Sequence, residues 1–113
     1  MVIGYGGHWE GAFEAPYRWT EASGMQHLGS FGDGNTYANS LTFDGSKIVG
    51  SGADGAFIWS ESSGMQGLSV FLSNLGTDVS GWSLGSADAI SSDGTAIAGT
   101  GSFNGEYRGF LIS

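Results

Sequence analysis

The sequence predicts an all-β chain built from four-stranded, β-propeller-like blades, about two and a half of them in 113 residues. Three observations lead to this prediction: an internal repeat, short runs rich in Ile, Val, Phe, Trp and Tyr, and Asp-Gly or Asn-Gly pairs between those runs. A unit of roughly 45 residues with four short strands is typical of a propeller blade. A β-sandwich or a β-solenoid made of the same hairpins is the alternative.

The internal repeat consists of two aligned pieces. Residues 17–28 (YRWTEASGMQHL) match 57–68 (FIWSESSGMQGL), and residues 38–52 (ANSLTFDGSKIVGSG) match 87–101 (ADAISSDGTAIAGTG). We therefore expect a single all-β repeat domain over 1–113, in three parts: a partial unit 1–36, a complete unit 37–85 and a partial unit 86–113. Since one unit cannot bury both of its faces, its neighbours must stack on it. Two arrangements would satisfy this requirement: self-association through the two terminal half-blades could close a ring, or the chain could be a purely structural piece of a longer surface repeat array.

Ten strands follow from the apolar runs, and the turns between them follow from the glycines. The strands are expected near residues 2–6, 16–20, 25–29, 37–43, 47–52, 56–60, 65–69, 86–91, 96–100 and 108–112. Pairs such as Asp44-Gly45, Asp54-Gly55, Asp93-Gly94 and Asn104-Gly105 favour tight hairpins in which both residues take a positive φ. No window has apolar residues at helical spacing, so almost no helix is expected. The non-repeating segment 69–86 is expected to cap the last unit or to form a subunit contact.

Charge and composition exclude several classes of function. Three basic residues stand against eleven acidic ones, a net charge of −8, which disfavours nucleic acid and anionic membrane surfaces as partners. Cysteine is absent, so disulfides and thiolate chemistry are excluded. The start, MVIGYGG, has no charged segment followed by an apolar one, so this chain shows no export signal of its own.

The sequence of the repeat resembles the HAF-repeat family of bacterial extracellular repeat proteins. The resemblance is carried by residues 17–28, 38–52, 57–68 and 87–101, and by the GWSL sequence that begins at Gly81. Pro16 interrupts the first Ala-Phe position of the pattern, and Gly109-Phe110-Leu111-Ile112 lacks its tryptophan. The resemblance implies a non-enzymatic repeat protein at the cell surface or outside the cell, and it implies no catalytic residues.

Motifs that carry chemistry elsewhere are weak in this chain. A GxGxxG pattern at 50–55 leads into a predicted strand, whereas dinucleotide binding needs a helix there. A GxSxG pattern at 81–85 has no histidine after it, as a hydrolase triad would require. His8 and His27 lack metal-ligand spacing. We expect no catalytic residue, no cofactor and no metal site; a weak calcium site and a carbohydrate-active enzyme fragment with paired carboxylates stay open as alternatives.

Tryptophans are the best lead to a ligand. Trp19 and Trp59 recur in the repeat and are expected in the core, as are Tyr17, Phe57 and Phe110. Trp9 and Trp82 do not recur in the repeat, and each lies in a Gly/Ser-rich stretch, which predicts a loop. His8 and Glu10 flank Trp9, and serines flank Trp82. The candidate ligand-binding residues are therefore Trp9, Trp82, His8 and Glu10, with glycans and a second copy of the chain as the expected partners.

Overall fold

The computed structural model describes residues 2–7, 14–21, 24–29 and 36–112. Strands dominate these residues and only one short helix interrupts them, so the predicted all-β class is confirmed. In chain order the elements are β1 (Val2–Gly7), β2 (Glu14–Thr20), β3 (Gly24–His27), β4 (Tyr37–Leu41), β5 (Lys47–Gly52), β6 (Gly55–Ser60), β7 (Gly64–Gly67), α1 (Leu68–Asn74), β8 (Trp82–Ile90), β9 (Ile97–Phe103) and β10 (Glu106–Ile112).

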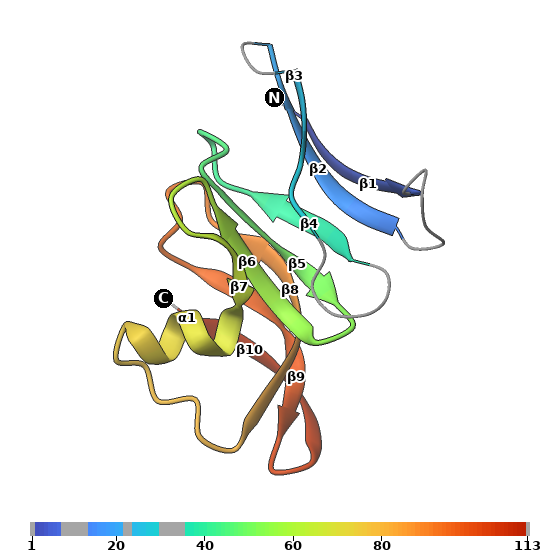
Figure 1. The fold of residues 1–113 in the computed structure, drawn as a ribbon. Coiled ribbons are helices and arrows are strands. Elements are labelled where there is room, and N and C mark those ends of the chain that lie inside the picture. The colour runs from blue at the N-terminus through green and yellow to red at the C-terminus, as the bar shows by residue number, and fades with distance from the viewer. Residues whose placement is uncertain (1, 8–13, 22–23, 30–35, 113) are drawn as a thin grey trace.

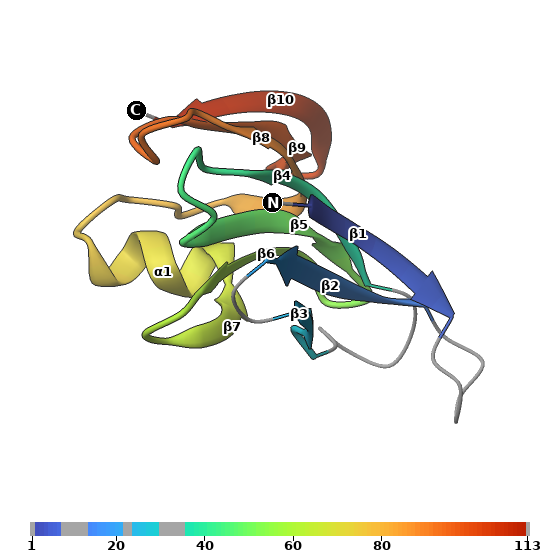
Figure 2. The ribbon, with the colours of Figure 1, turned by 90° about the horizontal axis from the view of Figure 1, so that it is seen from above.

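The strands form three antiparallel sheets (Figure 1). Their orders are β1-β2-β3, β4-β5-β6-β7 and β10-β9-β8, so each strand pairs only with its neighbours in sequence. Figure 2 shows the four-stranded sheet in the middle, with the first sheet on one side of it and the third on the other. The aligned pieces of the repeat occupy matching strands: 17–28 lies on β2 and β3, and 57–68 covers most of β6 and all of β7.

Asp-Gly turns join β4 to β5 and β8 to β9 with the same hydrogen bonds. Asp44 Oδ1 accepts from the Thr42 hydroxyl at 2.8 Å and from the N–H and hydroxyl of Ser46 at 3.0 and 2.8 Å. Asp93 repeats this pattern with Ser91 and Thr95. Only glycine takes a positive φ in these two turns, so the predicted two-residue geometry is wrong for them. The aspartate instead acts as a side-chain acceptor inside a longer turn.

The middle sheet has apolar side chains on both faces. Ile48, Phe57 and Trp59 belong to a buried cluster that Leu28, just after β3, completes. Val49, Ala56 and Ile58 belong to a second cluster, which also holds residues of α1 and of the third sheet. The sheet is therefore covered from both sides, which gives the chain two inter-sheet interfaces.

Hydrogen bonds connect the second and third sheets at their inner strands. Asn39 Nδ2 donates to the Ala87 carbonyl at 3.0 Å, and the Ile90 N–H donates to Ser40 Oγ at 3.2 Å. The Phe43 N–H donates to the Ser92 carbonyl at 2.9 Å, which joins the two Asp-Gly turns. These bonds set the registration of one sheet on the other.

Arg18 of β2 connects the first sheet to the second. Its side chain is buried, and its guanidinium lies 4.9 Å from the centre of the Trp59 ring. It donates to the Gly45 carbonyl at 2.9 Å, to Gln26 Oε1 at 2.7 Å and to Glu61 Oε1 at 2.6 Å. One side chain of the first sheet thus meets an aromatic ring, a turn carbonyl and a carboxylate of the second sheet.

Two expectations fail in the outer parts of the structure. Trp19, predicted in the core, is 40% exposed, because it follows Arg18 on the strand and so points to the opposite face, away from the second sheet. Residues 68–74 form helix α1, whose Leu68 and Leu72 are buried, where the predicted strand was to run to residue 69. The side chain of Tyr17 lies outside the described residues.

Replacing Arg18 by methionine tests the first interface. We expect Arg18→Met to lower the free energy of unfolding by about 2 kcal/mol, because Gly45 and Gln26 lose a charged donor. Urea denaturation followed by circular dichroism measures the loss. Arg108→Met is the matched control: Arg108 pairs with Glu106 on the surface, and its loss should cost less than about 0.5 kcal/mol. Equal losses in the two variants would contradict the role given to Arg18.

Acid sensitivity tests the two Asp-Gly turns. Hydrogen bonds from Ser46 and then Thr42 lower the pKa of Asp44 to about 2, and those from Thr95 and Ser91 lower the pKa of Asp93 to about 2. Because both pKa values lie below those of an unfolded chain, the stabilisation is complete above about pH 4 and is lost as the pH falls toward 2. Urea denaturation between pH 7 and pH 2.5 should show this decline, and Asp44→Asn with Asp93→Asn should flatten it. Asp54→Asn is the control, and a similar flattening by it would contradict the assignment.

Candidate functional site

Of the four residues predicted to bind a ligand, the structure places Trp82. Trp9, His8 and Glu10 lie outside the described residues. Trp82 is the first residue of β8, paired with Phe103 of β9, so the prediction that it lies in a loop is wrong. The strand begins earlier than expected because Gly81 and the Asn104-Gly105 turn are held together: the Asn104 N–H donates to the Gly81 carbonyl at 2.9 Å.

Two phenylalanines hold the Trp82 ring. The centre of the Phe103 ring lies 5.3 Å from that of Trp82, and the Phe110 ring meets it edge-on at 6.2 Å. Such tilted and edge-to-face arrangements are favourable beyond the area they bury. Trp82 is half-buried and lies against the core cluster between the second and third sheets. One part of the indole is therefore fixed by packing while another part is accessible.

Phe110 is itself held by a glycine on the neighbouring strand. Gly99 pairs with Phe110, and a Cβ atom on Gly99 would lie 2.6 Å from the tip of the Phe110 ring and 2.0 Å from the Ser86 carbonyl oxygen. Gly50 and Phe57 repeat this arrangement in the middle sheet. The Phe110 ring lies directly over Gly99, where there is no room for a Cβ atom. A glycine at position 99 is therefore needed for Phe110 to reach the position in which it contacts Trp82.

The segment after α1 brings polar groups to the Trp82 ring. The Thr77 N–H donates to the Leu72 carbonyl at 2.9 Å, and the Trp82 N–H donates to the Val79 carbonyl at 3.1 Å. These bonds form one turn where the segment leaves α1 and another where it enters β8. The result is a cavity of about 420 Å³, whose lining comprises Thr77, Asp78, Val79, Trp82, Leu84, Phe110, Leu111 and Ile112.

Asp78 is the acidic group of this cavity. Its Oδ1 accepts the Ser80 N–H at 3.0 Å, and hydrogen bonds from the Ser80 hydroxyl and backbone hold the pKa of Asp78 below its ordinary value. At neutral pH the carboxylate is ionised and accepts hydrogen bonds without donating one. Sequence reasoning missed Asp78 and Thr77. The available signal was their position, a few residues before Trp82 in the part of the chain that does not repeat.

An aromatic ring beside an ionised carboxylate and a hydroxyl suits a polyhydroxylated ligand. The ring offers an apolar surface to C–H groups, and the carboxylate accepts charge-assisted hydrogen bonds from hydroxyls. A cavity of about 420 Å³ also lies within the range of small-molecule sites, which is roughly 300–1,000 Å³.

Other chemistries find little support in the described residues. They contain no group of three or more His, Asp or Glu side chains arranged to hold a metal ion. The GxGxxG residues lie on β5 and run into β6, and the GxSxG residues enter β8, so neither pattern meets the helix that its chemistry needs. Within the described ranges, no helix is long and apolar enough to cross a membrane.

No family model, no curated protein and no solved structure matches this chain. The resemblance to HAF repeats accordingly stays a prediction.

Proposed function

We propose that this chain is a non-enzymatic β-repeat module that binds glycans in the cavity beside Trp82. The observation that carries the proposal is the fixed Trp82 ring with ionised Asp78 and Thr77 in the same cavity. A sugar ring would place its C–H face on the indole, and one of its hydroxyls would donate a hydrogen bond to the Asp78 carboxylate. The resemblance to HAF repeats supports a location outside the cell or at its surface.

The state of Asp78 favours binding over hydrolysis. A glycosidase needs a carboxylic acid with a raised pKa to protonate the leaving group. The pKa of Asp78 is shifted in the opposite direction, because Ser80 stabilises the ionised form. A carboxylate of this kind recognises hydroxyls and does not supply a proton, so a carbohydrate-active enzyme is the weaker alternative.

Affinity at a single cavity of this kind should be modest. One stacked ring and one charge-assisted hydrogen bond give only a few kcal/mol after the cost of immobilising the ligand. We therefore expect dissociation constants on the order of 1 mM for a monosaccharide. Several repeats presenting such cavities together would raise the apparent affinity.

Loss of the indole tests the proposed site. In a titration with a panel of neutral oligosaccharides, followed by amide NMR shifts, Trp82→Ala should weaken binding at least tenfold. Asp78→Asn, which keeps the shape but removes the charge, should weaken it about fivefold. Trp19→Ala is the matched control, since Trp19 is exposed on the far side of the first sheet. Unchanged binding by Trp82→Ala, or no binding by the wild type anywhere in the panel, would refute the proposal.

A second candidate function is assembly through stacking of copies of the chain. The repeat aligns Arg18 with Ile58, and both point toward the following sheet. Leu111 of β10 stands at the matching place in the third sheet and is 74% exposed. On the opposite face, Trp59 is covered by the first sheet, while its repeat partner Trp19 is exposed. The same stacking step would therefore place Leu111 of one copy on Trp19 of the next.

The edges of the outer sheets support the same candidate. β1 aligns with β5 and β10 aligns with β6, so the first sheet has no counterpart of β4 and the third has none of β7 among the described residues. Edge strands with unpaired backbone groups favour pairing with another chain. Head-to-tail stacking of this kind leads to a closed ring or to an open filament, depending on the rotation at each step.

Assembly is tested by light scattering after size exclusion. We expect the wild-type mass to rise with concentration or to stay at a discrete oligomer, and Leu111→Asp to shift it toward the monomer. Val70→Asp is the control, because Val70 is an exposed apolar residue of α1, away from the open sheet faces. A wild-type monomer at all concentrations would rule out assembly of this chain with itself.

A further inference from the structure

Lys47 is the one cation in the described part of the chain that has no acidic partner. Arg18 pairs with Glu61 at 2.6 Å, and Arg108 pairs with Glu106. The sequence holds three basic residues against eleven acidic ones, with a net charge of −8. An unpaired ammonium is therefore a rare point of positive potential on a negative molecule, and such a point attracts anions.

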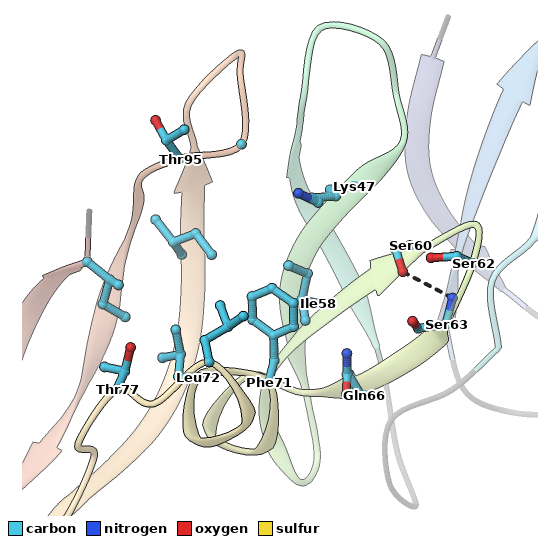
Figure 3. Close-up of a pocket in the computed structure, with 14 residues that line it drawn as sticks. Lys47, Ile58, Ser60, Ser62, Ser63, Gln66, Phe71, Leu72, Thr77 and Thr95 are labelled. Carbon is cyan, nitrogen blue, oxygen red and sulfur yellow. Dashed lines mark hydrogen bonds between the residues drawn. The ribbon is translucent and has the colours of Figure 1, made fainter.

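The Lys47 side chain lines a cavity of about 540 Å³ between the second and third sheets (Figure 3). Its floor is apolar and is formed by Ile58 of β6 together with Phe71 and Leu72 of α1. Figure 3 shows both α1 side chains reaching from the helix toward Ile58. The described lining residues include no aspartate or glutamate, so the charge of Lys47 is not compensated within the cavity.

Hydrogen-bond donors accompany Lys47 at the rim. Ser60 lies directly opposite Lys47 in the pairing of β5 with β6. The Ser60 hydroxyl oxygen accepts the Ser63 N–H at 3.2 Å, which leaves its own proton available to a ligand. Gln66 of β7 adds an amide, whereas the Thr95 hydroxyl is already committed to Asp93 at 2.7 Å. The lining of this cavity thus includes an ammonium, a hydroxyl and an amide that can contact an anionic ligand.

The interface between the first and second sheets has a different residue at the position that Ile58 occupies between the second and third sheets. In the repeat, Arg18 aligns with Ile58, so the position that carries a guanidinium in the first interface carries a short apolar side chain in the second. Arg18 is neutralised by Glu61, which belongs to the next sheet. In the second interface Lys47 reaches the 91–96 turn, where a Cβ on Gly94 would lie 3.5 Å from its Nζ. The Asp93 carboxylate of that turn accepts hydrogen bonds from Ser91 and Thr95, and among the described residues Lys47 forms no ion pair.

We infer that this cavity binds the carboxylate of an acidic sugar unit, with Lys47 as its ion-pair partner and Ser60 and Gln66 as hydrogen-bond donors. The choice of a sugar rests on the proposed glycan binding at Trp82. A carboxylate balances one ammonium, whereas a doubly charged phosphate would be disfavoured by the net charge of −8. The Phe71 ring on the floor offers an apolar surface to the body of the sugar.

The two cavities are neighbours, which links this inference to the proposed site. Thr77 and Ile112 line both of them. A glycan with a neutral unit on Trp82 therefore has an adjacent place for an acidic unit at Lys47. The specificity that follows is for chains in which a uronic acid stands next to a neutral sugar.

A matched pair of ligands tests the inference. Methyl β-glucuronide and methyl β-glucoside differ only at C6, which is a carboxylate in the first and a hydroxymethyl group in the second, and amide NMR shifts report where each one binds. We expect the glucuronide to shift the signals of Lys47, Gly94 and Thr95 and to bind about fivefold more tightly than the glucoside. Lys47→Gln should abolish this preference, and Lys47→Arg, which keeps the charge, should retain it. Added salt should weaken only the glucuronide in the wild-type protein, which needs no variant to fold.

The outcomes separate this inference from the proposed function. Equal affinity for both ligands, unaffected by Lys47→Gln, overturns the Lys47 site and leaves the Trp82 site standing. Glucuronide binding at Gly94 and Thr95 that survives Trp82→Ala, without binding by the glucoside or by any neutral oligosaccharide of the panel, supports the Lys47 site and refutes the Trp82 site. No binding by either ligand overturns the Lys47 site, and the Trp82 site is overturned with it if the neutral panel also fails to bind.

Discussion

Apolar side chains on both faces of the middle sheet determine the rest of the structure. Ile48 and Phe57 on one face and Val49 and Ile58 on the other are almost completely withdrawn from solvent, which requires a sheet on each side. Burial of such side chains contributes about 1.5–3 kcal/mol each, more than the net contribution of any single surface ion pair. The outer sheets are therefore held chiefly by the apolar side chains of the middle sheet that they bury. Hydrogen bonds such as that from Asn39 to the Ala87 carbonyl fix the position of the third sheet relative to the second.

The two interfaces share a geometry but differ in chemistry, and the difference arises where the repeat is broken. Arg18 fills one interface with a neutralised guanidinium, and Ile58 at the matching place leaves the other partly open. Residues 69–86, where the second copy of the repeat is nine residues longer than the first, supply most of α1 and the segment that carries Asp78. Repeated positions thus build the scaffold, while the departures from repetition create cavities and give them charge.

Much of the fold could be predicted from the sequence because its signals are local. Short runs rich in Ile, Val, Phe, Trp and Tyr predict the strands, Asp-Gly and Asn-Gly pairs predict the turns, and the repetition of both indicates which strands correspond. The Gly- and Ser-rich surroundings of Trp82 predict a loop. Trp82 lies on a strand because the Asn104 N–H, distant in sequence, donates to the Gly81 carbonyl and so joins the β9–β10 turn to the start of β8. Trp19 is exposed, against the prediction, for a different reason: a residue of the repeat is buried only where a neighbouring sheet covers its side of the strand. Asp78 has no motif, and only the folding of residues 75–81 brings it to the tryptophan.

The pairing of each strand with its sequence neighbours has a consequence for how the chain folds. Among the described strands, every hydrogen-bonded ladder joins neighbours in sequence, so none of these three sheets needs a distant part of the chain for the ladders described. Chains with mostly local pairings lose little loop entropy before contacts form, and they fold faster than β-proteins whose ladders join distant segments. The separate sheets would appear early as fluctuating meanders, and their stacking would be the slower, cooperative event. The transition state would then depend on side chains between sheets and only weakly on the turns.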